Sequence, residues 1–105
     1  MLYNKLIRDH IPAIIAQSGR QCRTETMDEA EFRQALRAKL VEEAQEVHAA
    51  PPAELLTELA DVLEVLDALM QTHNITAADV RAAQHQRRQE RGGFTKQIRL
   101  LEVLP

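Results

Sequence analysis

Residues 39–65 read KLVEEAQEVHAAPPAELLTELADVLEV and decide the fold, because the proline break AAPP at residues 49–52 separates two helical patterns. On both sides of it, apolar residues recur at spacings of three and four, as in helices that face a core. We expect helices over residues 28–48 and 52–72, and the short break favours an antiparallel hairpin. The apolar faces are Phe32, Leu36, Leu40 and Val47 before the break, and Leu55, Val62, Val65 and Leu69 after it.

A carboxylate interrupts each apolar face. Glu43 lies between two apolar positions of the first face, and Glu58 takes a position in the second where another leucine is expected. Glu43 is about seven residues before the middle of the break and Glu58 about as far after it, so an antiparallel hairpin places them at similar height. The hairpin is therefore expected to bring together four acidic side chains, with Glu42 at the margin: Glu43, Glu46, Glu58 and Asp61.

Four carboxylates in one place repel each other, and Glu is almost never fully buried unless it is paired. Lys39, one turn from Glu43, neutralises only one of them. Clustered oxygen ligands without Cys or paired His favour a hard cation over zinc, so we predict Mg²⁺, with Mn²⁺ as a substitute. Acidic helix faces are also common as solvated surfaces, and that alternative stays open. The interruption of both apolar faces at matched heights favours the metal site.

The rest of the chain predicts shorter helices and extended ends. A short helix is expected over residues 9–18, capped by Asp9 and stopped by Gly19, and a third long one after HNIT, ending at Gly92 and Gly93. The tail FTKQIRLLEVLP, residues 94–105, is a strand or an extended arm. The predicted fold class is all-α, or nearly so: an antiparallel helical hairpin with additional helices and short extended N- and C-terminal segments. Capping boxes are predicted at Asp28 with Glu31 and at Thr76 with Asp79.

Composition sets the broad class. A chain of 105 residues is expected to form one domain, residues 1–105. The net charge of −3 is too small to imply a nucleic-acid polymer or a membrane as partner. Cys22 is the only cysteine and the N-terminus lacks the apolar region of a signal peptide, so a cytoplasmic location is expected. A lone hairpin leaves one apolar face uncovered, which predicts a homodimer or homotetramer.

Two basic pairs are candidates for binding phosphate. Lys5 and Arg8 in YNKLIRDHIP precede the first short helix, where peptide dipoles favour anions. Arg87 and Arg91 are four residues apart before GGF, where two glycines allow close backbone approach. Arg87 and Arg91 could instead be solvated surface charges or partners of Glu90 and Asp79. Tyr3 could stack on a base.

Two motifs carry a family resemblance. EEAQE at residues 42–46, followed after eleven residues by ELAD at 58–61, resembles the EExxE…ExxD signature of the all-α nucleoside triphosphate pyrophosphatases. That group includes MazG-like proteins, dimeric dUTPases and phosphoribosyl-ATP pyrophosphatases. YNKLIRDHIP, ELADVLEVLDAL and RRQERGGF resemble its house-cleaning branch described as phosphoribosyl-ATP pyrophosphohydrolase-like. His10 departs from the lysine expected in RDKIP, which weakens any charge contact with phosphate from that position.

The resemblance implies Mg²⁺-dependent hydrolysis of a nucleoside triphosphate to a nucleoside monophosphate and pyrophosphate, as house-cleaning of non-standard nucleotides. Alternatives are the phosphoribosyl-ATP pyrophosphatase of histidine biosynthesis and a non-catalytic helical module that binds nucleotide or metal. The catalytic candidates are Glu42, which would bind a further ion or orient the attacking water, and Glu43. The implied metal ligands are Glu43, Glu46, Glu58 and Asp61, and the implied triphosphate contacts are Lys5, Arg8, Arg87 and Arg91.

Overall fold

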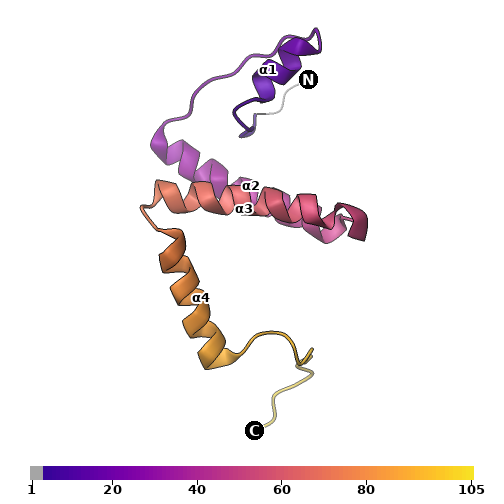
Figure 1. The fold of residues 1–105 in the computed structure, drawn as a ribbon, viewed down its shortest axis with the longest axis vertical. Helices are drawn as coiled ribbons and strands as arrows, with labels where there is room; N and C mark the ends of the chain where they lie inside the picture. The colour runs from indigo at the N-terminus through magenta and orange to yellow at the C-terminus, as the bar shows by residue number, and fades with distance from the viewer. Residues whose placement is uncertain (1–3) are drawn as a thin grey trace. The chain divides into compact units, whose positions relative to one another are not determined.

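A computed structural model of the protein describes residues 4–105, and all of its regular structure is helical. The chain divides into two compact units, one ending at Asn74 and the other spanning Ile75–Pro105. The first unit contains α1 (Ile11–Gln17), α2 (Glu29–Ala49), the short 3-10 helix η1 (Pro52–Glu54) and α3 (Leu55–Thr72), and the second contains α4 (Ala77–Arg91) (Figure 1). The all-α fold class is thereby confirmed. The single domain expected from the length stays a prediction.

The hairpin predicted from the proline break is present in the first unit. In Figure 1 the colour passes from purple to pink along α2 and continues back along α3 beside it, so the two helices pack side by side in opposite directions. The chain is extended at Ala50 and Pro51, because proline fixes its own φ and disfavours helix in the residue before it. Leu36 on α2 and Val65 on α3 are the buried apolar side chains of the described residues, so the core lies between the predicted faces.

The first turn of α2 is fixed by the predicted capping box. The Asp28 carboxylate accepts a hydrogen bond from the Glu31 backbone N–H at 2.8 Å, and the Glu31 carboxylate accepts one from the Asp28 backbone N–H at 3.3 Å. These bonds satisfy two donors that have no partner within the helix. The start of α2 sets the position of every later residue on it, including Glu43.

The first short helix differs from its prediction at one end. We expected Asp9 to cap it, but α1 begins at Ile11, its N-cap is His10 in a helical conformation, and no side chain caps it. Pro12 in the first turn supplies the start instead, since its fixed φ suits a helix whose first N–H groups lack partners in any case. The stop is as predicted: Gly19 has φ +85°, which favours glycine.

The second unit consists of α4 and an irregular tail. Thr76 Oγ1 accepts from the Asp79 backbone N–H at 3.0 Å, and Asp79 Oδ2 accepts from the Thr76 N–H at 3.3 Å, so the second capping box is also confirmed. Gly92, at φ +82°, ends the helix. Residues 92–105 form no strand, so the strand alternative for the tail is wrong. In the part of the chain that the structure describes, no helix combines the length and apolar character needed to cross a membrane.

Candidate metal and active site

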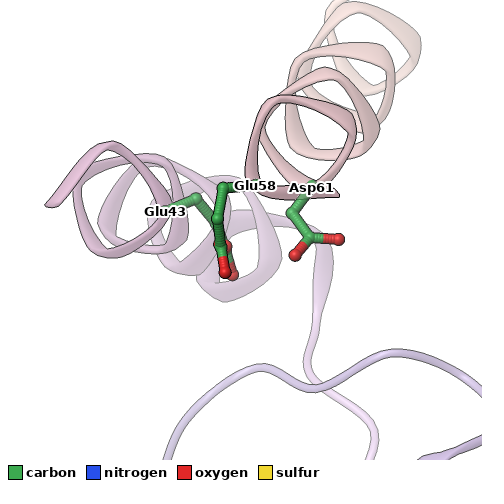
Figure 2. Close-up of side chains that lie close together, drawn as sticks. All are labelled: Glu43, Glu58 and Asp61. Carbon is green, nitrogen blue, oxygen red and sulfur yellow. The ribbon is translucent and has the colours of Figure 1, made fainter. Parts of the chain in front are cut away.

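Three carboxylates from the two helices of the hairpin lie close together. Glu43 belongs to α2, Glu58 and Asp61 belong to α3, and one oxygen of each lies within 4.8 Å of the others. Figure 2 shows the carboxylates of Glu43 and Glu58 directed to the same side of the helices, with Asp61 beside them. They meet because Glu43 and Glu58 are about equally far from the break in an antiparallel pair, while Asp61 follows Glu58 by three residues and stays on its edge. We call these three residues the acidic triad.

In the part of the chain that the structure describes, two carboxylate oxygens of the acidic triad lack the hydrogen bonds that buried oxygens need. Glu43 is only 7% exposed, and its Oε2, like that of Glu58, is buried without a hydrogen-bond partner among the described residues. Burial raises the pKa of the Glu43 carboxyl, and the charges of Glu46 and Asp61 raise it further against the opposing effect of Lys39. Burial also raises the pKa of Glu58, and the neighbouring carboxylates add to that rise. Each group therefore favours gaining a proton or a cation.

These properties fit a hard divalent cation. All of the donors are carboxylate oxygens, two of the oxygens are buried and unpartnered, and a cation between the helices would satisfy both defects at once. Zinc would be expected with Cys or His ligands, and neither type belongs to the acidic triad. The residues present would thus accommodate Mg²⁺ or Mn²⁺.

Glu46, the fourth predicted ligand, lies at the edge of this group. It follows Glu43 by one turn on α2 and its side chain is exposed. It is outside the acidic triad, but its charge adds to the rise that burial causes in the pKa of both Glu43 and Glu58. The structure therefore brings three of the four predicted ligands together and leaves Glu46 adjacent. Their role as ligands stays a prediction.

Glu42 is held by two lysines. Lys5 Nζ lies 3.3 Å and Lys39 Nζ 3.5 Å from the same oxygen, Oε1. Partial burial acts to raise the pKa of Glu42, but the hydrogen bonds and charges of the two lysines outweigh it and lower the pKa below its ordinary value. Glu42 is therefore ionised at neutral pH. Lys39 also lies 3.5 Å from Glu43 Oε1. It therefore forms ion pairs with two carboxylates, whereas the sequence predicted one.

The contact between Arg8 and Asp61 has no counterpart in the sequence analysis. Arg8 Nη2 donates a hydrogen bond to Asp61 Oδ1 at 2.7 Å, across 53 residues of sequence. The sequence indicated only that Arg8 precedes a helix. Its contact with Asp61 could not be predicted, because helical periodicity does not show where an irregular segment meets a distant helix. Lys5 and Arg8, both predicted to contact phosphate, thus contact carboxylates in this structure.

The remaining predicted phosphate contacts belong to the second unit. Arg87 and Arg91 are exposed on α4, and no ion pair joins either of them to Glu90 or Asp79 among residues 4–105. Their proposed role as partners of those acids therefore gains no support. The suggested stacking of Tyr3 on a base lies outside the described residues.

Comparison with known proteins places the chain in a family. The family model described as phosphoribosyl-ATP pyrophosphohydrolase matches residues 13–88, which is most of the chain and includes α2, α3 and the acidic triad. No curated protein and no solved structure matches. The resemblance drawn from EEAQE and ELAD is thereby confirmed. The chain belongs to the phosphoribosyl-ATP pyrophosphohydrolase family and is a nucleotide pyrophosphohydrolase, a hydrolase that acts on phosphoric anhydride bonds.

Proposed function

We propose that the protein is a Mg²⁺-dependent nucleoside triphosphate pyrophosphohydrolase that removes non-standard nucleotides by converting them to nucleoside monophosphates and pyrophosphate. The observation that carries the proposal is the acidic triad with its two buried, unpartnered oxygens, Oε2 of Glu43 and Oε2 of Glu58. Such an arrangement, in a member of a pyrophosphohydrolase family, supports a cation site on which nucleotide phosphates assemble.

The reaction breaks the bond between the α-phosphorus and the oxygen that bridges to the β-phosphorus, as water attacks the α-phosphorus. When bound, Mg²⁺ neutralises phosphate charge and lowers the pKa of water in its coordination sphere. Glu43, Glu46, Glu58 and Asp61 are the residues that would hold it.

Glu42 has a separate role in the proposal. Its carboxylate remains ionised because Lys5 and Lys39 lower its pKa, so it can accept a hydrogen bond from the attacking water and orient it. Two lysines already lie on Glu42 Oε1, and their positive charge disfavours binding of a further ion by this carboxylate. We therefore assign Glu42 to the water. Lys5, Arg8, Arg87 and Arg91 remain the proposed contacts for the triphosphate.

A substrate panel tests the proposal. Pyrophosphate release should be measured with ordinary, oxidised and deaminated nucleoside triphosphates and with phosphoribosyl-ATP, each with and without Mg²⁺. Glu43→Gln should abolish Mg²⁺-dependent release, because it removes one charged ligand while keeping nearly the same side-chain size and shape. Glu64→Gln is the matched control, since Glu64 is an exposed acid on α3 outside the acidic triad. Full activity of the Glu43→Gln variant would contradict the site assignment.

Phosphoribosyl-ATP hydrolysis in histidine biosynthesis is the second candidate, favoured by the description of the matching family. The matched range begins at residue 13 and leaves out the segment with Lys5 and Arg8, so the N-terminal part of the proposed site is not part of that likeness. Rescue of a histidine auxotroph lacking this step, together with preferential turnover of phosphoribosyl-ATP, would favour the second candidate.

We further propose a homodimer or a dimer of dimers. Leu56, Leu59 and Leu63 follow each other at spacings of three and four on α3 and are 82%, 46% and 56% exposed. This α3 leucine stripe is separate from the face that packs on α2, and leucines at this spacing can interdigitate with the same stripe of a second copy about a twofold axis. Among the described residues the hairpin buries few apolar side chains, so its own core is small. A second chain that covers the α3 leucine stripe would bury more apolar surface.

A further inference from the structure

The N-terminal segment, residues 4–10, brings cations to both helices of the hairpin. Arg8 Nη2 lies 2.7 Å from Asp61 Oδ1 on α3, and Lys5 Nζ lies 3.3 Å from Glu42 Oε1 on α2. This segment has no helix or strand, so its position on the hairpin depends on such contacts. Asp61 is also a member of the acidic triad. Arg8 and a divalent cation would therefore compete for one carboxylate.

The ion pair between Arg8 and Asp61 is of the kind that breaks easily. The Arg8 side chain is 56% exposed and that of Asp61 is 32% exposed, so water screens the attraction between them. Exposed pairs of this kind contribute little to stability, and Arg8 lies on an irregular segment rather than on a rigid helix. A divalent cation at the acidic triad would repel the guanidinium while binding the same carboxylate. These conditions favour exchange over a permanent orienting contact.

We infer that Arg8 is an exchangeable counter-ion of Asp61. It pairs with this carboxylate while the acidic triad is free of metal, and it is released when a divalent cation binds, to donate hydrogen bonds to the phosphate oxygens of the substrate. A guanidinium suits both partners, because its planar set of donors matches carboxylate and phosphate alike. This inference rests on the metal site of the proposed function. It deepens that function by stating that Arg8 contacts Asp61 before the metal binds and contacts phosphate afterwards.

Opposite effects on two ligands distinguish this role from others. In Arg8→Gln, Mn²⁺ alone should bind about two- to fivefold more tightly, as expected when a screened ion pair no longer competes. Pyrophosphate at saturating Mn²⁺ should bind roughly tenfold to a hundredfold more weakly, because a charged hydrogen bond to phosphate is lost. If Arg8 only oriented Asp61, its substitution would weaken the binding of both Mn²⁺ and pyrophosphate. If Arg8 only stabilised the fold, its substitution would not change the two affinities in opposite directions.

The experiment uses the full chain. Free Mn²⁺ is measured by electron paramagnetic resonance in the absence of nucleotide, and pyrophosphate binding is measured by calorimetry. Arg8→Lys retains the charge and should restore both affinities toward those of the unaltered protein. Arg20→Gln is the matched control, an exposed arginine just beyond α1 for which no ion pair is found among the described residues, and it should change neither affinity.

A second measurement needs no substitution. In the unaltered protein, Mn²⁺ should speed the modification of Arg8 by phenylglyoxal relative to that of Arg20, as read by mass spectrometry, because release from Asp61 exposes the guanidinium. An unchanged rate at Arg8, or weaker Mn²⁺ binding by Arg8→Gln, would overturn the exchange. If the unaltered protein and Glu58→Gln bind Mn²⁺ equally, the metal site of the proposed function fails and the exchange fails with it. Glu58-dependent Mn²⁺ binding that is insensitive to Arg8 would overturn the exchange alone.

Discussion

Glu43 of α2 and Glu58 of α3 meet across the hairpin, and each keeps one carboxylate oxygen, Oε2, buried with no hydrogen-bond partner among residues 4–105. Burial raises the pKa of both carboxyls, the charge of Asp61 adds to the rise at both, and the charge of Glu43 adds to the rise at Glu58. Without a cation this relationship destabilises the ionised hairpin. Because the two carboxylates repel each other, metal binding, protonation or substitution at either one should change the stability of the hairpin.

The stability of the metal-free protein should fall as pH rises from about 4.5, the ordinary value for these carboxyls. The folded-state pKa values of Glu43 and Glu58 are raised, so in this window the folded state binds more protons than the unfolded state, and the free energy of unfolding decreases with pH. Glu42, with a lowered pKa, contributes in the opposite sense at lower pH, where its stabilising effect is lost as pH falls. Urea unfolding in EDTA across a pH series measures this slope. A stability that rises steadily from pH 4.5 to 7 would contradict the prediction.

Mg²⁺ should raise the unfolding temperature at pH 7, because a ligand that binds only the folded state stabilises it by mass action. Glu58→Gln should raise the unfolding temperature of the metal-free protein, since it removes one of the repelling charges, and should largely remove the rise caused by Mg²⁺. Its nucleotide turnover should fall by at least about a hundredfold. Differential scanning fluorimetry with EDTA or Mg²⁺ separates the two effects, and Glu64→Gln serves as control. A full Mg²⁺ response in Glu58→Gln would exclude Glu58 as a ligand.

Leu36→Ala should destabilise the protein by about 2–5 kcal/mol, because Leu36 is 3% exposed and its truncation leaves a cavity between α2 and α3. Val41→Ala on the same helix is the control, since Val41 is exposed, and its cost should stay within about 0.5 kcal/mol. Urea unfolding monitored by circular dichroism measures both. Equal costs for the two variants would show that the core does not lie on the Leu36 face.

Leu59→Glu should shift the protein toward monomer, because it places a charge in the middle of the α3 leucine stripe. Size-exclusion chromatography with light scattering at several protein concentrations measures the change. Leu101→Glu is a matched control, an equally drastic change at an exposed leucine of the C-terminal tail. An unaltered protein that is monomeric at all concentrations would rule out the proposed dimer. If Leu59→Glu leaves a dimer intact, the α3 leucine stripe is not its interface.

Much of the helical structure could be predicted because its causes are local. The Asp28–Glu31 and Thr76–Asp79 capping boxes form within four residues, and the proline break sets the antiparallel course of α2 and α3. The start of α1 was mispredicted for a related reason. An acid at position 9 suggested a cap, whereas proline at position 12 fixes the first turn without any side-chain hydrogen bond.

The sequence by itself determined that Glu43 and Glu58 break two apolar faces at matched distances from a short turn, since helical periodicity and turn length are readable along the chain. Only the tertiary structure decided that Asp61 completes the acidic triad while Glu46 stays at its edge, and that two carboxylate oxygens are buried without partners. It alone also joined Arg8 to Asp61 across 53 residues. The physical reason is that side-chain burial and long-range ion pairs depend on how irregular segments return to the helices, and no local spacing records that path.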